Sequence, residues 1–457
     1  MAQNTLVDFA DGMKDVFASE AVKDQLHNRT NAFKWFKEKK IRGRGGRGVA
    51  SAAESGYIFS VETRRPAGVG WAADAADTSA ALPAAERPRV DKAAVHPKWL
   101  YGRVEASGQL IRLSQDNENA FAREITYSMK RMITAMSKML NYSCFGSGAG
   151  ELARLNENPD GAATAIDVDA ANHIYNGTGT ASRHDTGTRY VWPGMVLQAG
   201  SALFTPTIRA GTGQVSSVAA DDATGTSATV TFDSAPDAAW ADNDYLFLNG
   251  TAVVGSTNSD TSRVMNGLLG LVGNDGALGT SDLSDTVHNI NASTAGNEFW
   301  RPYIRDNSGT ARALTLGLMH LVYDRVSERG NGETPNKIVM HKNQRRRYTD
   351  LLSPDVRYSP QELLGGFSKL TFAGGDTAIP IETDDDCPYG VIFFLNTDSF
   401  RLGMWHDLGW ANEDGLLLRN VSGEDSWEAF AVTALELYCD RRNANGILTD
   451  LNVSLTS

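Results

Sequence analysis

The sequence predicts an α+β protein with a small β domain inserted into it. Residues 117–142 carry apolar side chains at helical spacing over a length that indicates one long helix. Two strand-like stretches, 56–64 and 98–106, flank a tip of small residues, which is typical of an extended hairpin. From about 163 to 262, charge and helical period vanish and short β-rich runs separated by turn residues replace them.

Composition bounds the class of protein. The chain has 457 residues, of which 41% are hydrophobic and 21% charged, so a packed core is expected. Its formal net charge is −12. Because a protein that grips nucleic acid neutralises phosphates with Lys and Arg, the chain as a whole is not expected to bind nucleic acid.

Cysteine usage and hydropathy indicate a reducing compartment and no membrane association. Cys144, Cys387 and Cys439 lie far apart without CxxC spacing, so neither a zinc site nor a disulfide framework is expected. The N-terminal residues lack the basic and apolar regions of a signal peptide. No apolar run approaches the ~20 residues that span a bilayer.

The N-terminal region combines a predicted helix with a basic, glycine-rich run. Residues 5–24 have helical spacing, and their apolar stripe consists of Leu6, Phe9, Met13, Val16 and Phe17. A helix of this length is marginal alone, so the stripe is expected to dock on another surface. Arg42, Arg44 and Arg47 follow within the run 42–48, where dense glycine favours a hinge over a helix. With few arginines and no interleaved aromatics, a nucleic-acid-binding role for this run is disfavoured.

The predicted hairpin has a tip between Pro66 and Pro88 that is rich in Ala, Gly and Asp. A lone two-stranded hairpin is barely stable in water, so this one needs a partner surface. Trp71 stands out in the tip because an aromatic side chain among small residues is costly unless a neighbour covers it. Arg64 and Arg65 begin the tip and are further candidate contact residues.

The rest of the chain alternates glycine-rich and β-rich segments with one more helix. The long helix ends in the flexible run 146–150, and the insert at 163–262 predicts a small antiparallel barrel or sandwich. Residues 311–329 are expected to form a helix. Candidate strands are 337–340, 391–395 and 427–440, and the segment 446–451 closes the chain.

Taken in order, these segments resemble the HK97-type fold of tailed-phage major capsid proteins. The stretches that carry the resemblance are 45–49, 100–108, 119–148, 335–352 and 436–451. The resemblance implies an N-terminal arm (1–50), an E-loop hairpin (51–108), a P-domain spine helix (109–162), the inserted β domain (163–262), a mainly A-domain segment (263–414) and returning P-domain strands (415–457). The insert is absent from the minimal fold.

This resemblance also implies a function and partners. The chain is expected to assemble into pentamers and hexamers of an icosahedral shell that encloses double-stranded DNA without sequence-specific binding. The expected inter-subunit contact residues are Phe9, Met13, Arg42, Arg44, Arg47, Arg64, Arg65 and Trp71. A separate scaffolding protein is favoured because no long charged N-terminal scaffolding segment is present. A portal and a decoration protein are the other expected partners, and the expected location is the virion, after assembly in the host bacterial cytoplasm.

Three functions other than that of a capsid protein are considered. An encapsulin-like compartment shares the fold, and a β-rich decoration protein or adhesin is disfavoured by the two long helices. A hydrolase is disfavoured because Gly146-Ser147-Gly148 fails the G-x-S-x-G spacing and follows a helix instead of a strand. The histidines show no paired-ligand spacing. Asp384-Asp385-Asp386 and the pair Asp167 and Asp169 are better explained as solvated turns than as cation sites. No catalytic residue, cofactor or metal is predicted.

Overall fold

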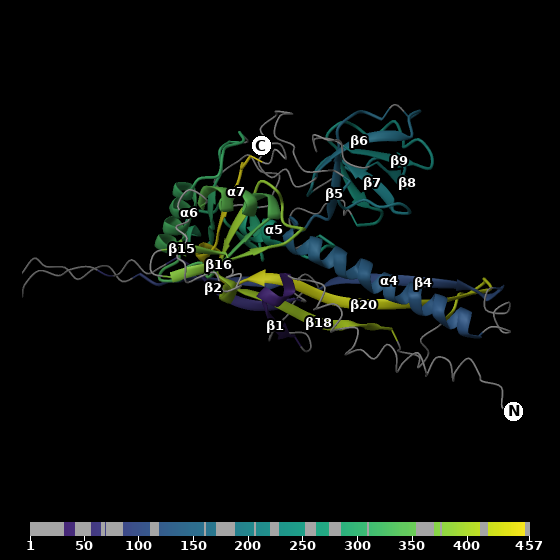
Figure 1. Ribbon diagram of the computed structural model, residues 1–457. Helices are drawn as coiled ribbons and strands as arrows, with labels where there is room; N and C mark the ends of the chain where they lie inside the picture. The colour runs from purple at the N-terminus through teal and green to yellow at the C-terminus, as the bar shows by residue number, and fades with distance from the viewer. Residues whose placement is uncertain are drawn as a thin grey trace, which may run out of the picture.

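The computed structural model contains two larger β-sheets, a separate hairpin and a closed barrel, arranged along one long helix (Figure 1). The described residues are 32–41, 56–64, 69, 86–109, 118–159, 161–170, 188–204, 207–219, 228–251, 262–273, 285–308, 310–352, 370–374, 377–411 and 419–452. The helix expected at residues 5–24 lies outside these residues.

The long helix α4 (Glu118–Phe145) confirms the helix expected at 117–142. Its described buried face repeats every three or four residues and consists of Met129, Ile133, Met136 and Leu140. At 1.5 Å per residue the helix is about 40 Å long. Met132 and Met139 are partly buried against the same cores, so the methionines of this helix serve packing inside the subunit.

The first sheet lies along α4 and has five strands. They are β1 (Lys37–Lys40), β4 (Lys98–Ser107), β18 (Phe400–Trp410), β19 (Arg419–Asn420) and β20 (Ser426–Cys439). Strand β20 is central, because it pairs with β18 and β19 on one side and antiparallel with β4 on the other. β1 pairs in parallel with β18, and the short helix η1 (Ala32–Trp35) precedes it. The strand expected at 427–440 is therefore the centre of this sheet.

The predicted hairpin exists, but the prediction of its second strand is wrong. β2 (Tyr57–Arg64) pairs antiparallel with β3 (Arg89–Val95), and these two strands form a sheet of their own. The stretch expected to return the hairpin, 98–106, is β4 of the first sheet. The sequence Arg-Val-Asp-Lys-Ala-Ala-Val of β3 has few strongly β-favouring residues, which hid the strand. Pro97 lacks an N–H donor, so the ladder breaks there and the chain changes sheets.

The predicted β domain is a closed barrel with the strand order β10-β5-β6-β9-β8-β7. Its strands are β5 (Glu151–Leu155), β6 (Ala165–Ala170), β7 (Val196–Gly200), β8 (Gly213–Val218), β9 (Ala228–Phe232) and β10 (Tyr245–Leu248). β5 lies before the predicted range 163–262. The prediction missed it because its sequence, Glu-Leu-Ala-Arg-Leu, lacks the polar, β-rich composition of the later strands. The barrel has its own core, which Tyr142 of α4 joins.

The second sheet lies beyond the C-terminal end of α4, where the Phe145 ring is 6.4 Å from that of Phe393, and has the order β13-β21-β17-β14-β16-β15. Its strands are β13 (Tyr303–Arg305), β14 (Lys337–Met340), β15 (Thr371–Gly374), β16 (Thr377–Thr383), β17 (Ile392–Leu395) and β21 (Gly446–Leu448). The strands expected at 337–340 and 391–395 pair with each other inside it. Helices α6 (Leu316–Arg329) and α7 (Lys342–Leu352) share a core with this sheet.

Several shorter helices and strands complete the described structure. They are α5 (Leu268–Val272), β11 (Thr286–Val287), β12 (Ile290–Asn291), η5 (Glu298–Trp300), η7 (Thr397–Ser399) and η8 (Arg442–Ala444). The helix expected at 311–329 begins later, at Leu316. The Thr315 side chain accepts a hydrogen bond from Leu318 N at 3.2 Å and so caps it there. Arg312 instead forms a parallel bridge with Leu451.

Candidate assembly surfaces

Most of the residues predicted to contact a neighbouring subunit are outside the described part of the chain. These residues are Phe9, Met13, Arg42, Arg44, Arg47, Arg65 and Trp71. Arg64 is described and ends β2, where its guanidinium forms an ion pair with Glu86 just before β3. Backbone amides of Gly296 and Glu298 hold the pKa of the Glu298 carboxyl below its usual value, and nearby Arg301 and Arg64 add to this. Arg64 thus has partners within its own chain, and its contact with a second subunit stays a prediction.

The root of the hairpin is anchored on the first sheet by aromatic side chains. Tyr57 and Phe59 lie against Tyr438 of β20, with ring centroids 5.8 and 5.3 Å apart. Ala94 N donates to His288 O at 3.1 Å, and Cys439 N donates to His288 Nε2 at 3.3 Å. Burial raises the pKa of the Tyr438 hydroxyl. The start of β2 and the end of β3 are therefore anchored on the first sheet, and the partly exposed Arg64–Glu86 pair lies at the opposite end of the described strands.

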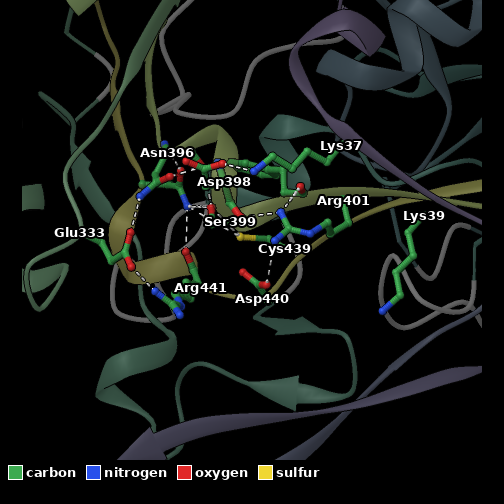
Figure 2. A network of polar contacts seen from close by, with 12 residues as sticks. Lys37, Lys39, Glu333, Asn396, Asp398, Ser399, Arg401, Cys439, Asp440 and Arg441 are labelled. Carbon is green, nitrogen blue, oxygen red and sulfur yellow. Dashed lines mark hydrogen bonds and ion pairs between the residues drawn. The ribbon is translucent and has the colours of Figure 1, made fainter.

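A polar network joins the two sheets where the chain crosses between them twice (Figure 2). One crossing runs from β17 through η7 to β18, and the other runs from β20 through η8 to β21. Asn396 N donates to Asn445 Oδ1 at 2.8 Å, and Asn445 Nδ2 donates to Ser399 Oγ at 3.0 Å and to Arg441 O at 2.8 Å. Because each crossing supplies partners for the other, the network fixes how the two sheets are oriented.

Ion pairs surround this network (Figure 2). Glu333 pairs with Arg441 and accepts from Asn396 Nδ2 at 3.0 Å. Lys37 of β1 pairs with Asp398 and lowers the pKa of that carboxyl. Burial raises the pKa of the Cys439 thiol to about 12. A thiol with a raised pKa is a poor nucleophile at neutral pH, so Cys439 contributes to packing and hydrogen bonding in this network.

Strand β4 presents an exposed aromatic pair. Trp99 is 50% exposed and Tyr101 65% exposed, and their rings stack with centroids 6.3 Å apart. A cavity of ≈ 360 Å³ lies beside them between β4, α4 and the barrel, lined by apolar side chains such as Leu100 and Val264. Adjacent exposed aromatic and apolar surface marks interaction sites. The sequence predicted this strand, but the alternation Trp-Leu-Tyr does not reveal which side faces solvent.

The joint between α4 and the barrel contains a buried carboxyl. Glu151, the first residue of β5, is 2% exposed, and its Oε2 accepts from Ser147 Oγ at 2.8 Å. The Glu151 carbonyl accepts from the Tyr142 hydroxyl. Burial raises the pKa of the Glu151 carboxyl to about 7. Ser147, in the run that superficially suggested a nucleophile, is 1% exposed and serves this joint.

This pKa predicts a pH-dependent stability that Glu151→Gln removes. The folded-state pKa is raised above the usual 4.5, so the stabilisation is complete below pH 4.5 and is lost as pH rises through 7. Above pH 7 the wild type is expected to be less stable than Glu151→Gln by up to about 3 kcal/mol. Below pH 4.5 the two should be equal. Denaturant unfolding across this range measures the difference, and an equal gain from Glu62→Gln on the exposed face of β2 would refute the assignment.

The interpretation of the two acidic clusters as solvated turns is wrong for Asp384, which is 1% exposed, and for Asp169, which lies in β6 and is 2% exposed. Asn141 Nδ2 donates to Asp384 Oδ1 at 3.0 Å and to Asp386 Oδ2, and Asp385 pairs with Lys342. Thr229 Oγ1 donates to Asp167 Oδ1 at 2.7 Å. Within the described residues, no group of three or more His, Cys, Asp or Glu side chains could hold a metal ion. No helix among them is long and apolar enough to cross a membrane.

Comparison with known proteins identifies the fold. No protein-family model matches the chain, and no curated protein matches it. The chain superimposes on a chain of the cyanophage A-1(L) capsid asymmetric unit with a TM-score of 0.50 at 13% identity, covering 92% of this chain and 93% of that one. A Mycobacterium phage Adephagia structure matches at 8% identity with a TM-score of 0.40, covering 92% and 89%. The Synechococcus elongatus SrpI encapsulin matches at 12% identity with a TM-score of 0.22, covering 33% and 53%. The chain has the α+β fold of a phage capsid chain.

Proposed function

We propose that this chain is the major capsid protein of a tailed bacteriophage, which self-assembles into an icosahedral shell around the double-stranded DNA genome. The observation that carries the proposal is the likeness to the cyanophage capsid chain over 92% of this chain. The match covers 92% of this chain and 93% of that one, so it extends over nearly the whole fold and is not confined to one motif. Since fold alone does not determine function, assembly has to be tested directly.

The proposal assigns the parts of an HK97-type subunit to this chain. Residues 1–50 are the N-terminal arm. Within 51–108 the hairpin of β2 and β3 is the E-loop, whereas β4 belongs to the first sheet. Residues 109–162 contain the P-domain spine helix, and the inserted domain expected at 163–262 begins with β5. Residues 263–414 are mainly the A-domain, and 415–457 return to the P-domain. The hairpin supports the E-loop assignment, because β2 and β3 form a sheet of their own that is anchored on the first sheet through Tyr57 and Phe59.

In the proposed shell, identical subunits form five- and six-membered rings through heterologous contacts. Phe9 and Met13 of the arm, the arginines 42, 44, 47, 64 and 65, and Trp71 of the E-loop contact neighbouring subunits. The exposed pair Trp99 and Tyr101 supports such packing because a neighbour would remove both rings from water. Stability of the shell then comes from area summed over several partners.

The proposed partners follow from the same role. A separate scaffolding protein guides assembly in the host bacterial cytoplasm, a portal completes the shell, and a decoration protein binds the finished virion. DNA is enclosed without sequence-specific contacts, in agreement with a net charge of −12. The proposal requires no cofactor, metal or membrane.

Negative-stain electron microscopy of the purified chain, alone and with its scaffolding protein, tests the proposal. Closed shells or ring-shaped capsomers are the expected result. Only monomers or small symmetric oligomers in both samples would refute a shell function. Shells that form readily without scaffold, and that package a co-expressed enzyme in place of DNA, would favour the encapsulin-like alternative.

A further inference from the structure

The inserted barrel is a compact unit that no strand pairing ties to the rest of the molecule. In the part of the chain that the structure describes, its six strands pair only with one another. Its hydrophobic core is separate from those of the two sheets and takes in only Tyr142 and Met139 from α4. A domain of this kind can move as one body when the side-chain contacts that orient it break.

The connection between α4 and β5 has the properties of a pivot. The chain passes through Gly148 and Gly150, whose φ angles of 91° and 87° are favourable for glycine only. The contacts of Glu151 with Ser147 and Tyr142 lie at this same point. A cavity of ≈ 410 Å³ opens between α4, the barrel and the turn at 384–386. Because domain interiors are normally close-packed, the barrel is incompletely packed on that side.

A series of side-chain contacts bridges the edge of this cavity, from the barrel to the segment between β16 and β17 of the second sheet. Tyr190, in the turn before β7, lies against Tyr142 of α4 with ring centroids 3.9 Å apart. The Tyr190 hydroxyl donates to Asp386 O at 3.2 Å. Arg189 Cζ lies 5.2 Å from the Tyr190 ring centroid and 4.9 Å from that of Tyr389. The guanidinium therefore contacts one ring of the barrel and one ring beside the second sheet.

The Tyr389 ring is held in place by the start of α7. The His341 ring lies 4.1 Å from it, centroid to centroid. His341 Nδ1 accepts from Asn343 N at 3.1 Å and so caps the helix. Burial, and then the nearby charge of Arg189, lower the pKa of the His341 imidazole to about 3. His341 is therefore neutral at neutral pH, and it fixes the Tyr389 ring without repelling Arg189.

We propose that Arg189, Tyr190 and Tyr389 form a latch that holds the barrel in one orientation against the second sheet, and that the barrel turns about Gly148 and Gly150 when this latch opens. A cation–π contact and a single hydrogen bond are each weak, so the latch opens and closes reversibly. While closed, it determines which face of the barrel points away from the molecule. The inference goes beyond the proposed shell function, because the motion belongs to a single chain.

Spin labels on Ser216→Cys in β8 and Asp324→Cys in α6 measure the orientation of the barrel in the full-length chain. Both positions are exposed, and the natural cysteines 144, 387 and 439 are buried. Double electron–electron resonance is expected to give one narrow distance in this background. Arg189→Ala with Tyr190→Phe removes the cation–π contact and the hydrogen bond of the latch but keeps the ring against Tyr142. It is expected to raise the population at a second distance about thirtyfold.

Two further variants locate the effect. Tyr389→Ala breaks the latch from the other side and should give the same second distance, and adding Arg189→Ala to it should change nothing more. Arg154→Ala is the matched control, because that guanidinium lies 5.1 Å from the Tyr245 ring inside the barrel, and it should leave the distance unchanged. A single narrow distance in Arg189→Ala with Tyr190→Phe, or equal broadening in Arg154→Ala, overturns the proposal. A chain that shows the latch and forms no shells would refute only the proposed function.

Discussion

Replacement of residues 66–88 by Asn-Gly is expected to yield a folded chain that forms no shells. The root of the hairpin keeps its contacts, because Tyr57, Phe59 and Ala94 bind Tyr438 and His288 far from the change. The Arg64–Glu86 pair is lost, but a partly exposed ion pair contributes about 1 kcal/mol or less. Because Arg64 pairs with Arg89, the new connection is Arg65-Asn-Gly, a three-residue hairpin loop with Gly at its last position, which is a common hairpin connection. Circular dichroism and thermal unfolding should therefore match the wild type.

Electron microscopy of the shortened chain with scaffold decides the outcome. The tip is proposed to supply the contact to the next subunit, so its loss should abolish rings as well as shells. A tip of unchanged length with Trp71→Ala is the matched control and should assemble with a higher critical concentration. Normal shells from the shortened chain would eliminate the E-loop assignment of residues 51–108.

Gly267→Ala is expected to destabilise the chain by about 4 kcal/mol. Gly267 precedes the fully buried helix α5, and its backbone is extended, so the constraint is space and not conformation. A Cβ would lie 2.3 Å from Ser143 O, 2.5 Å from Gly146 O and 2.6 Å from Gly146 N. These are backbone atoms at the end of α4, which cannot rotate away as a side chain could. Denaturant unfolding measures the loss.

Gly317→Ala is the matched control for this change. Gly317 lies in the first turn of α6, and a Cβ there would meet no atom within 4 Å. Alanine favours helix over glycine, so this variant should gain about 0.5 kcal/mol. If Gly267→Ala unfolds at the same denaturant concentration as the wild type, α5 does not pack against the end of α4 as the structure has it.

The elements with strong periodicity could be predicted from the sequence to within a few residues. The apolar spacing of Met129, Ile133 and Met136 predicted α4, and Val391–Leu395 predicted a buried strand that the structure places in β17. Predictions failed where the local pattern was weak. β3 was missed because five of its seven residues are charged or alanine, and the start of α6 was misplaced because the cap at Thr315 lies within an apolar stretch.

The candidate contact surfaces could be predicted only in part. Trp71 and the arginines were selected because they are unusual for their surroundings, and their contacts with a neighbour stay predictions. The pair Trp99 and Tyr101 became visible once β4 was placed at the edge of the first sheet. The network of Asn396, Asn445 and Ser399 has no local signal, because its members belong to two crossings that are far apart in the chain.

The α+β class, the long helix, the presence of a hairpin and the β-rich insert could thus be predicted from local residue spacing. Hydrophobic period and turn chemistry act between residues that are close in sequence. Long-range contacts between strands, which only the tertiary structure shows, determined the remaining features of the fold. Whether 98–106 returns the hairpin or joins β20 depends on free energies of contact between strands more than 300 positions apart. The contact of Asn141 with Asp384 likewise joins residues 243 positions apart. Burial of Glu151 likewise depends on how the barrel closes over the end of α4, and this alone gives an ordinary glutamate a pKa of about 7.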